Sequence, residues 1–126
     1  MSLVVDASVV LAVVLAEAGG EDAFDSLNGA TMSVVNASEV YRRLHDGGVE
    51  LQEAVAVVER LKLKLVVFDE LQAIEAARLR PATRKIGASF ADRACLALAL
   101  KTGSPVLTAD RKWDLLELPL EIRQIR

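Results

Sequence analysis

Four acidic residues lie where apolar, strand-like runs end or where helix-like runs begin. Asp6 and Asp110 each close an apolar run, and Glu39 and Asp92 each fall in the first turn of a predicted helix. The carboxyl ends of parallel strands and the amino ends of the following helices meet at one edge of a sheet, where open α/β proteins bind ligands. We therefore expect four carboxylates, contributed by four segments, along one rim.

Carboxylates gathered in this way need a partner of opposite charge. Two like charges about 5 Å apart repel by roughly 3 kcal/mol at an effective dielectric constant near 20. Proton uptake or a bound cation relieves this repulsion, and a hard ion such as Mg²⁺ or Mn²⁺ prefers carboxylate oxygens and water. With one His and one Cys in the chain, no His or Cys cluster competes for zinc.

Each acid also has a purely structural interpretation. Ser89 and Asp92 have the spacing of a capping box, in which the hydroxyl and the carboxylate each accept from a backbone amide at the helix start. Asn36 and Glu39 have the same spacing, and Asn36 is the predicted cap of its helix. Asp6 can cap the helix that starts near Ser8, and Asp110 can start a turn before Arg111. The sequence leaves open whether the acids converge or only cap.

The elements that must position these acids alternate between strand-like and helical patterns. Apolar runs predict four strands and an edge strand, at 3–6, 31–35, 63–68, 104–110 and 120–125. Apolar periodicity and Gly, Asn or Pro stops predict helices at 8–20, 21–29, 36–48, 49–63, 69–81 and 89–100. This alternation predicts an α/β fold in one domain, 1–126, with a mainly parallel central sheet covered by helices on both faces.

Composition narrows the class of protein further. Hydrophobic residues make up 52% of the chain and aromatic residues only 4%, which is typical of layered α/β packing. Eighteen acids against fifteen bases give a net charge of −3, so there is no general charge for nucleic-acid binding, although a local basic strip can act within an acidic total. The single Cys95 excludes a disulfide framework.

The apolar run at 9–16 superficially resembles a signal peptide. No Lys or Arg precedes it, Asp6 interrupts the wider apolar stretch that leads into it, and eight residues are too few to span a bilayer. The sequence therefore predicts a cytoplasmic protein with no membrane association. This segment is apolar on all sides. Burial against the sheet explains one face, and the remainder favours a subunit interface.

Other acid-rich or nucleotide-binding classes are not supported. A haloacid-dehalogenase-type phosphatase needs Asp-x-Asp after its first strand, and the chain has Asp6-Ala7-Ser8. A response-regulator receiver needs an acidic pair near the first strand, which is missing. No Walker loop or GxGxxG is present, so a nucleotide cofactor is not indicated.

Taken together, the stretches VVDASVVLAVVL, VNASEV, FDELQAIEAARLRPATRKIGASFADRACLALAL and PVLTADRKW resemble the PIN-domain ribonucleases. More narrowly, the chain is similar to the toxin subunits of bacterial VapBC toxin–antitoxin pairs. GxSxADRxCLALA followed by VLTADRxW is a specific combination, and the matching stretches cover most of the chain. Ala88 and Phe90 depart from the Leu that many relatives carry, but no acid of the pattern is missing.

The resemblance implies a three-layer PIN-like fold and a metal-dependent endoribonuclease. Asp6, Glu39, Asp92 and Asp110 would then be catalytic residues around Mg²⁺, with Mn²⁺ as a substitute, and Asp6 and Asp92 would be the main ligands. Ser8 and Thr108 would orient carboxylates, with helix capping as the alternative role. Cleavage would leave 5′-phosphate and 3′-hydroxyl ends.

The resemblance also implies partners. These are a cognate antitoxin, an RNA substrate such as tRNA or rRNA, a second copy of the chain, and a higher assembly with the antitoxin. Candidate RNA contacts are Arg84, Lys85, Arg93 and Arg111, while Trp113 either stacks on a base or anchors the core. Two alternatives stay open, namely a non-catalytic PIN-like binding module and a metal-dependent DNase or phosphatase using the same acids.

Overall fold

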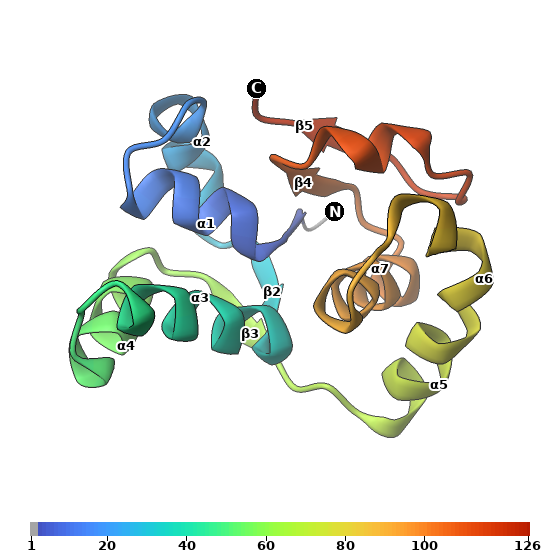
Figure 1. The fold of residues 1–126 in the computed structure, drawn as a ribbon, viewed down its shortest axis with the longest axis horizontal. Coiled ribbons are helices and arrows are strands. Elements are labelled where there is room, and N and C mark those ends of the chain that lie inside the picture. Colours follow the sequence, from blue (N-terminus) through green and yellow to red (C-terminus); the bar gives the residue numbers. More distant parts are fainter. Residues whose placement is uncertain (1–2) are drawn as a thin grey trace.

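Five short parallel strands form the centre of the molecule in the computed structural model, which describes residues 3–126 (Figure 1). The strands are β1 (Val4–Val5), β2 (Thr31–Ser33), β3 (Lys64–Val66), β4 (Val106–Thr108) and β5 (Ile122–Gln124), in the order β3-β2-β1-β4-β5. All four pairings are parallel, and Val4 lies opposite both Thr31 and Val106. The predicted parallel α/β sheet is therefore confirmed.

Within residues 3–126, seven α-helices and two short 3₁₀ helices connect the strands. The helices are α1 (Ala7–Val14), α2 (Gly20–Leu27), α3 (Val34–Asp46), α4 (Leu51–Arg60), α5 (Glu70–Arg78), α6 (Arg80–Thr83) and α7 (Phe90–Thr102). The 3₁₀ helices are η1 (Arg84–Ile86) and η2 (Arg111–Leu115). The α-helices form a layer on each side of the sheet, with α1–α4 on one side and α5–α7 on the other (Figure 1).

The two core clusters follow from the alternation of side chains along each strand. Val5 and Leu107 face the cluster built with α1–α4, whereas their neighbours Val4 and Val106 face the cluster built with α5 and α7. Strands this short and covered on both faces need continuous apolar runs, which is why LVV and PVL lack polar alternation.

The chain reverses its direction across the sheet between β1 and β4. From β1 it moves outward through β2 to β3, and it then returns to place β4 on the other side of β1. This reversal is a topological switch point, where ligands bind beyond the carboxyl ends of the strands. Asp6 and Asp110 follow these two neighbouring strands, so the fold brings them to the same edge.

Several predicted boundaries are wrong. The helix predicted to run from residue 8 to the glycine pair ends at Val14, and Ala16 adopts a positive φ of 55° in the following loop. Gly20 instead begins α2. A glycine is needed here because α2 passes so close to α1 that a Cβ at this position would overlap the Ala12 carbonyl oxygen. The helix predicted up to Pro81 divides into α5 and α6.

Much of the apolar first helix is covered by other elements of the chain. Val9, Val10 and Ala12 are fully buried within the chain, where α1 packs against α2, α3 and β4. Val13 and Val14 stay partly exposed and the following Leu15 is 48% exposed, so an interface on this segment stays a prediction. None of the helices in residues 3–126 has the length and apolarity that a membrane crossing requires.

Candidate acidic site at the carboxyl edge of the sheet

Asp6 is the most buried acid of the site. It follows β1 in extended conformation and caps α1, where its Oδ1 accepts from the Val9 amide at 3.2 Å. Only 5% of Asp6 is exposed. The predicted cap is thus correct, but burial of this depth exceeds what capping an exposed helix end would need.

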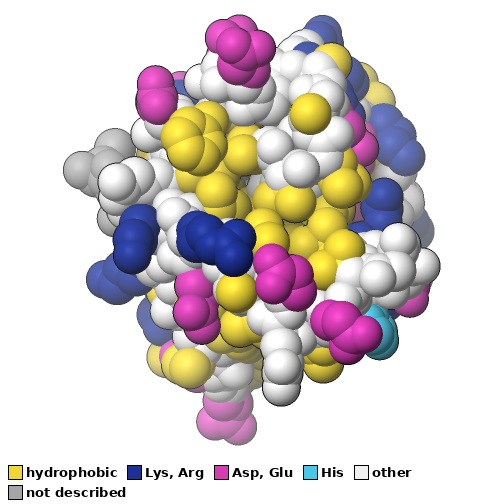
Figure 2. Space-filling view, turned by 90° about the vertical axis from the view of Figure 1, so that its left-hand side faces the viewer, with side chains coloured by type: hydrophobic (Ala, Val, Ile, Leu, Met, Phe, Trp, Pro, Cys, Tyr) yellow, Lys and Arg dark blue, Asp and Glu magenta, His cyan; other side chains and the backbone are white. Residues whose placement is uncertain are grey.

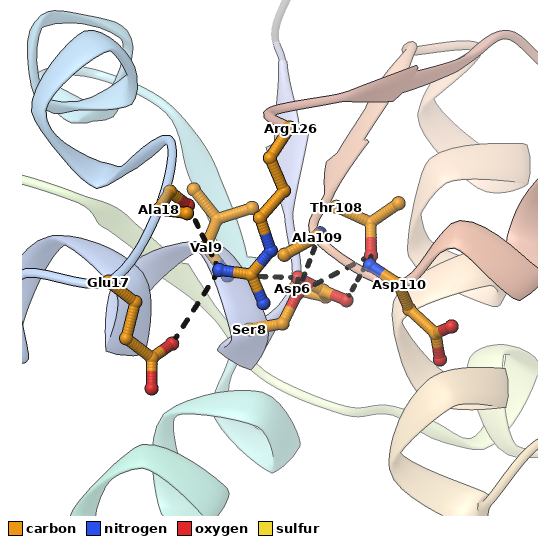
Figure 3. Close-up of polar contacts among 9 residues, drawn as sticks. All are labelled: Asp6, Ser8, Val9, Glu17, Ala18, Thr108, Ala109, Asp110 and Arg126. Carbon is orange, nitrogen blue, oxygen red and sulfur yellow. Dashed lines mark hydrogen bonds and ion pairs between the residues drawn. The ribbon is translucent and has the colours of Figure 1, made fainter.

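Two hydroxyl groups hold the Asp6 carboxylate from either side (Figure 3). Ser8 Oγ donates to Oδ1 at 2.6 Å, and Thr108 Oγ1, from the neighbouring β4, donates to Oδ2 at 2.7 Å. Each hydroxyl is itself fixed by a backbone amide, Ala109 N for Ser8 and Asp110 N for Thr108. Because Oδ1 already accepts two bonds and Oδ2 only one, Oδ2 keeps the capacity to bind a cation.

Burial raises the pKa of Asp6 from its usual 3.8 to about 6. The hydrogen bonds from Ser8, Thr108 and the Val9 amide act in the opposite direction, and the negative charge of Asp92 adds to the rise. The ionised carboxylate is therefore held in an environment that disfavours its charge, which a nearby cation would reverse.

Asp92 occupies the first turn of α7 and completes the predicted capping box. Its amide donates to Ser89 Oγ at 3.1 Å, while its Oδ2 accepts from the Ser89 amide at 3.0 Å. The charge of Asp92 also raises the pKa of both Asp6 and Glu39. Asp92 therefore caps its helix and at the same time acts electrostatically on two other acids of the predicted set.

Glu39 lies one turn into α3 and is half-buried. Burial raises its pKa, the charge of Asp92 raises it further, and the neighbouring Asn36 side chain opposes the rise. The predicted cap for this helix is wrong, because Ser33 caps α3 by accepting from the Val35 amide at 3.2 Å. Asn36 is buried inside the first turn instead, and its Nδ2 donates to the Ala91 carbonyl at 3.0 Å.

Asp110 is joined to the site through Thr108. Its amide donates to Thr108 Oγ1, and its own carboxylate caps η2 by accepting from the Lys112 amide at 3.0 Å. Its side chain points away from Asp6 in Figure 3. Burial raises the pKa of the Cys95 thiol, one turn after Asp92, and the charges of Asp6, Asp92 and Glu39 add to the rise.

The acids therefore gather as an electrostatic group of Asp6, Glu39 and Asp92, with Asp110 linked by hydrogen bonds. Within residues 3–126, no three His, Cys, Asp or Glu side chains lie close enough to hold one metal ion together. Mg²⁺ usually retains several waters and takes only one or two protein carboxylates, with substrate phosphates supplying further ligands. A hard-oxygen donor set with a strained buried carboxylate fits such an ion and does not fit an all-protein cage.

The predicted basic residues divide into two groups. Arg84 and Lys85 lie in η1, which packs against η2 with Arg111, and all three side chains reach the surface. Lys85 pairs with Glu117 at 3.4 Å, and Arg111 donates to the Arg126 carbonyl. Arg93 is different, because its Nη1 donates to the Ala76 carbonyl of α5 at 2.8 Å. Its geometry therefore gives no support to the predicted RNA contact.

Sequence reasoning gave Arg126 no role and gave Asn36 only the role of a helix cap. Arg126 reaches from the segment after β5 to the loop between α1 and α2, where it donates to the Ala18 carbonyl at 2.9 Å and lies 3.8 Å from Glu17 (Figure 3). No sequence signal points to Arg126. For Asn36, the sequence did contain a signal. Ser33, at the end of the preceding strand, is an equally good cap, and a cap there places Asn36 inside the helix.

Burial of Asp6 predicts a pH-dependent loss of stability in metal-free protein. The folded state holds the Asp6 proton more tightly, so stability falls as pH rises from about 4 to about 6, by about 3 kcal/mol in total. Asp6→Asn should therefore be the more stable protein at pH 7.5, with the difference shrinking toward pH 4. Urea unfolding in EDTA at several pH values measures this, and a difference that does not change with pH would contradict it.

Comparison with known proteins adds family evidence to this geometry. A family model of the PIN domain matches residues 3–117. A search of curated proteins finds no significant match.

Solved structures share the whole fold at low sequence identity. The DNA-bound VapBC from Salmonella typhimurium has a TM-score of 0.75 at 16% identity and covers 100% of this chain and 99% of its own. VapBC-1 from nontypeable Haemophilus influenzae gives 0.74 at 14% identity, with 99% and 98% covered. FitAcB from Neisseria gonorrhoeae gives 0.68 at 19%, also with 99% and 98% covered. At such identities the likeness shows the fold.

Proposed function

The chain belongs to the PIN domain family, and from this premise we propose that it is a metal-dependent endoribonuclease, the toxin of a type II toxin–antitoxin pair. The observation that carries the proposal is the Asp6 carboxylate, which is buried, held by two hydroxyls, and near the like charge of Asp92. A purely structural cap needs none of this. A site for a divalent cation needs all of it.

Asp6 and Asp92 would hold the ion, and Glu39 and Asp110 would act beside it directly or through water. Mg²⁺ or Mn²⁺ bound there would lower the pKa of a coordinated water and offset charge on the phosphodiester oxygens. The protein's own contribution is orientation. Ser8 and Thr108 hold the Asp6 carboxylate and leave Oδ2 with the capacity to bind a cation, and the Ser89 backbone amide holds the Asp92 carboxylate at the start of α7.

RNA binding would rely on a local basic strip, because the chain as a whole is acidic. Arg84 and Lys85 of η1 and Arg111 of η2 lie on packed 3₁₀ helices next to Asp110. RNA phosphates that approach the acids along this side would meet these cations. RNA binding would then release counterions from the RNA, so its affinity would fall as the salt concentration rises. The fully buried Trp113 takes no part, so of its two predicted roles the core anchor is correct.

An antitoxin is the proposed protein partner. Solved structures of the same fold include a toxin–antitoxin complex from Klebsiella pneumoniae, with a TM-score of 0.69 at 15% identity. The side of the molecule formed by α1–α4 carries an apolar hollow with charged side chains of both signs around it (Figure 2). Leu15, Phe24 and Leu51 are among the exposed hydrophobic residues of these elements. An exposed apolar surface with charged residues around it is typical of a site that binds a segment of another protein.

Pairing of two copies through α5 is the proposed route to a homodimer. Leu71 is 69% exposed and Ile74 is 49% exposed, and they line a groove of about 310 Å³ against α7. Glu75 with Arg78, and Asp69 with Lys101, place both charge signs beside it. A surface that carries both signs can pair with itself around a two-fold axis.

Leu71→Glu should therefore turn a dimer into a monomer. A carboxylate at the centre of the apolar contact would be buried without a partner, which disfavours association. Light scattering after size-exclusion chromatography reads out the mass, with Leu115→Glu as a control because Leu115 is exposed on η2, away from α5. A monomeric wild-type protein, or equal dissociation by both variants, would contradict this interface.

Cleavage of labelled nucleic acids by the purified protein tests the proposed function. RNA and DNA of the same sequence should be compared in Mg²⁺, in Mn²⁺ and in EDTA. We expect cleavage of RNA that needs the metal and leaves 5′-phosphate ends. Preferred cleavage of DNA, or release of inorganic phosphate alone, would favour the DNase or phosphatase alternative. Folded protein that neither cuts nor binds metal would favour the non-catalytic binding module.

A further inference from the structure

Asn36 links the two helices that carry Glu39 and Asp92. It is 1% exposed, and its Nδ2 crosses from α3 to the Ala91 carbonyl, one residue before Asp92, at 3.0 Å. Because Ser33 already caps α3, the Asn36 side chain is not used at its own helix start. Within the described chain, Asn36 Oδ1 has no hydrogen-bond partner although it is buried. Burying an amide in this state is costly, so the position has a function that an apolar residue would not serve.

The same amide acts on Glu39. Residues three apart on a helix lie on one face, so the Asn36 side chain is next to the Glu39 carboxylate. It lowers the pKa of Glu39, against the effects of burial and of the Asp92 charge. A side-chain amide has two N–H donors, and only one is used by the Ala91 carbonyl. The second is available to Glu39.

We propose that Asn36 is a positioning residue that sets the separation of Glu39 and Asp92 and thereby the affinity of the acidic site for a divalent cation. This inference rests on the proposed function. Glu39 and Asp92 repel each other, and the bond across the α3–α7 contact opposes their separation at the point where the two helices approach the site. Without the amide, α3 and the first turn of α7 lose their polar connection, and Glu39 can turn toward solvent.

Mn²⁺ binding to the purified protein, followed by the EPR signal of free Mn²⁺, tests this. We expect Asn36→Ala to weaken Mn²⁺ binding by about 10- to 100-fold, the usual effect of removing a residue that orients a ligand. Asn36→Leu, which fills most of the space without donors, should show the same loss. This second variant distinguishes the loss of the N–H donors from the effect of a cavity, and it replaces the alanine variant if that variant does not fold.

Gln72 provides a matched control for a merely structural role. It is also 1% exposed, donates through Nε2 to a backbone carbonyl, that of Val67 at 3.1 Å, and has an unpaired buried side-chain oxygen. It lines the α5–α7 groove together with Lys101, near the other end of α7 from Asp92. Gln72→Ala should lower the unfolding free energy about as much as Asn36→Ala while leaving Mn²⁺ affinity within about 2-fold.

A double-mutant cycle with Glu39→Gln completes the test. If Asn36 acts through the separation of Glu39 and Asp92, its replacement should change Mn²⁺ affinity by no more than about 2-fold once Glu39 is neutral. Folded Asn36 variants with wild-type affinity would overturn the inference and leave the nuclease proposal intact. Wild-type protein that binds Mn²⁺ but does not cut RNA would overturn the nuclease proposal, while weaker binding by the variants would still support Asn36. Absence of Mn²⁺ binding to wild-type protein would overturn both.

Discussion

Asp92→Asn is expected to lower RNA cleavage by at least about 100-fold, equivalent to about 3 kcal/mol of transition-state stabilisation, in a protein that stays folded. Asn can still accept the hydrogen bond from the Ser89 amide, and the bond from the residue 92 amide to Ser89 Oγ involves only backbone on that side. The substitution therefore removes the charge and keeps the cap. Initial rates on labelled RNA, with circular dichroism to check folding, measure the effect.

Ser89→Ala is the complementary control, because it removes part of the cap and keeps the carboxylate. It should cost about 1 kcal/mol of stability, the usual value for a lost cap, and retain most of the activity. If Ser89→Ala is as inactive as Asp92→Asn, or if Asp92→Asn stays within about 3-fold of wild type, then Asp92 is a structural cap and the proposed site is wrong.

Trp113→Ala should have the largest effect on stability, about 3–5 kcal/mol, because it empties a large buried site. Trp113 is 0% exposed and anchors η2, which Asp110 caps, in the core cluster with α7. Urea unfolding measures the change, with a downward shift of the midpoint of at least about 1 M for a typical slope in a domain of this size.

Leu115→Ala is the control for this prediction because it removes an apolar side chain from the same short helix. Leu115 is 61% exposed, so its truncation should change the unfolding free energy by less than about 0.5 kcal/mol. Equal losses for the two variants would mean that η2 is not anchored through Trp113, and the route by which the core positions Asp110 would have to be revised.

The placement of the acids could be predicted because it depends on chain direction. Asp6 and Asp110 each follow an apolar run, and parallel strands bring such positions to one edge whatever the details of the loops. The capping box of Ser89 and Asp92 could likewise be predicted, since both bonds are local. These features depend only on local geometry and on the common direction of parallel strands.

Features that depend on which segments of the chain pack against each other could not be predicted. Ser33 caps α3 in place of the predicted Asn36, and the residue types alone do not show which of the two lies at the start of the helix. The share of the apolar segment that the chain itself covers could not be predicted either, because the sequence does not show that α2 packs against α1 at Gly20. Arg93 looked like an exposed cation because the Ala76 carbonyl that binds it belongs to another helix.

The central claim is that Asp6 and Asp92 hold a divalent cation at the carboxyl edge of the sheet. Anomalous diffraction from crystals grown with Mn²⁺ at a concentration that supports cleavage tests it most directly. We predict a peak at roughly 2 Å from carboxylate oxygens of Asp6 and Asp92, with waters completing the coordination. A peak elsewhere on the protein with none at this edge, or no peak at all, would contradict the claim.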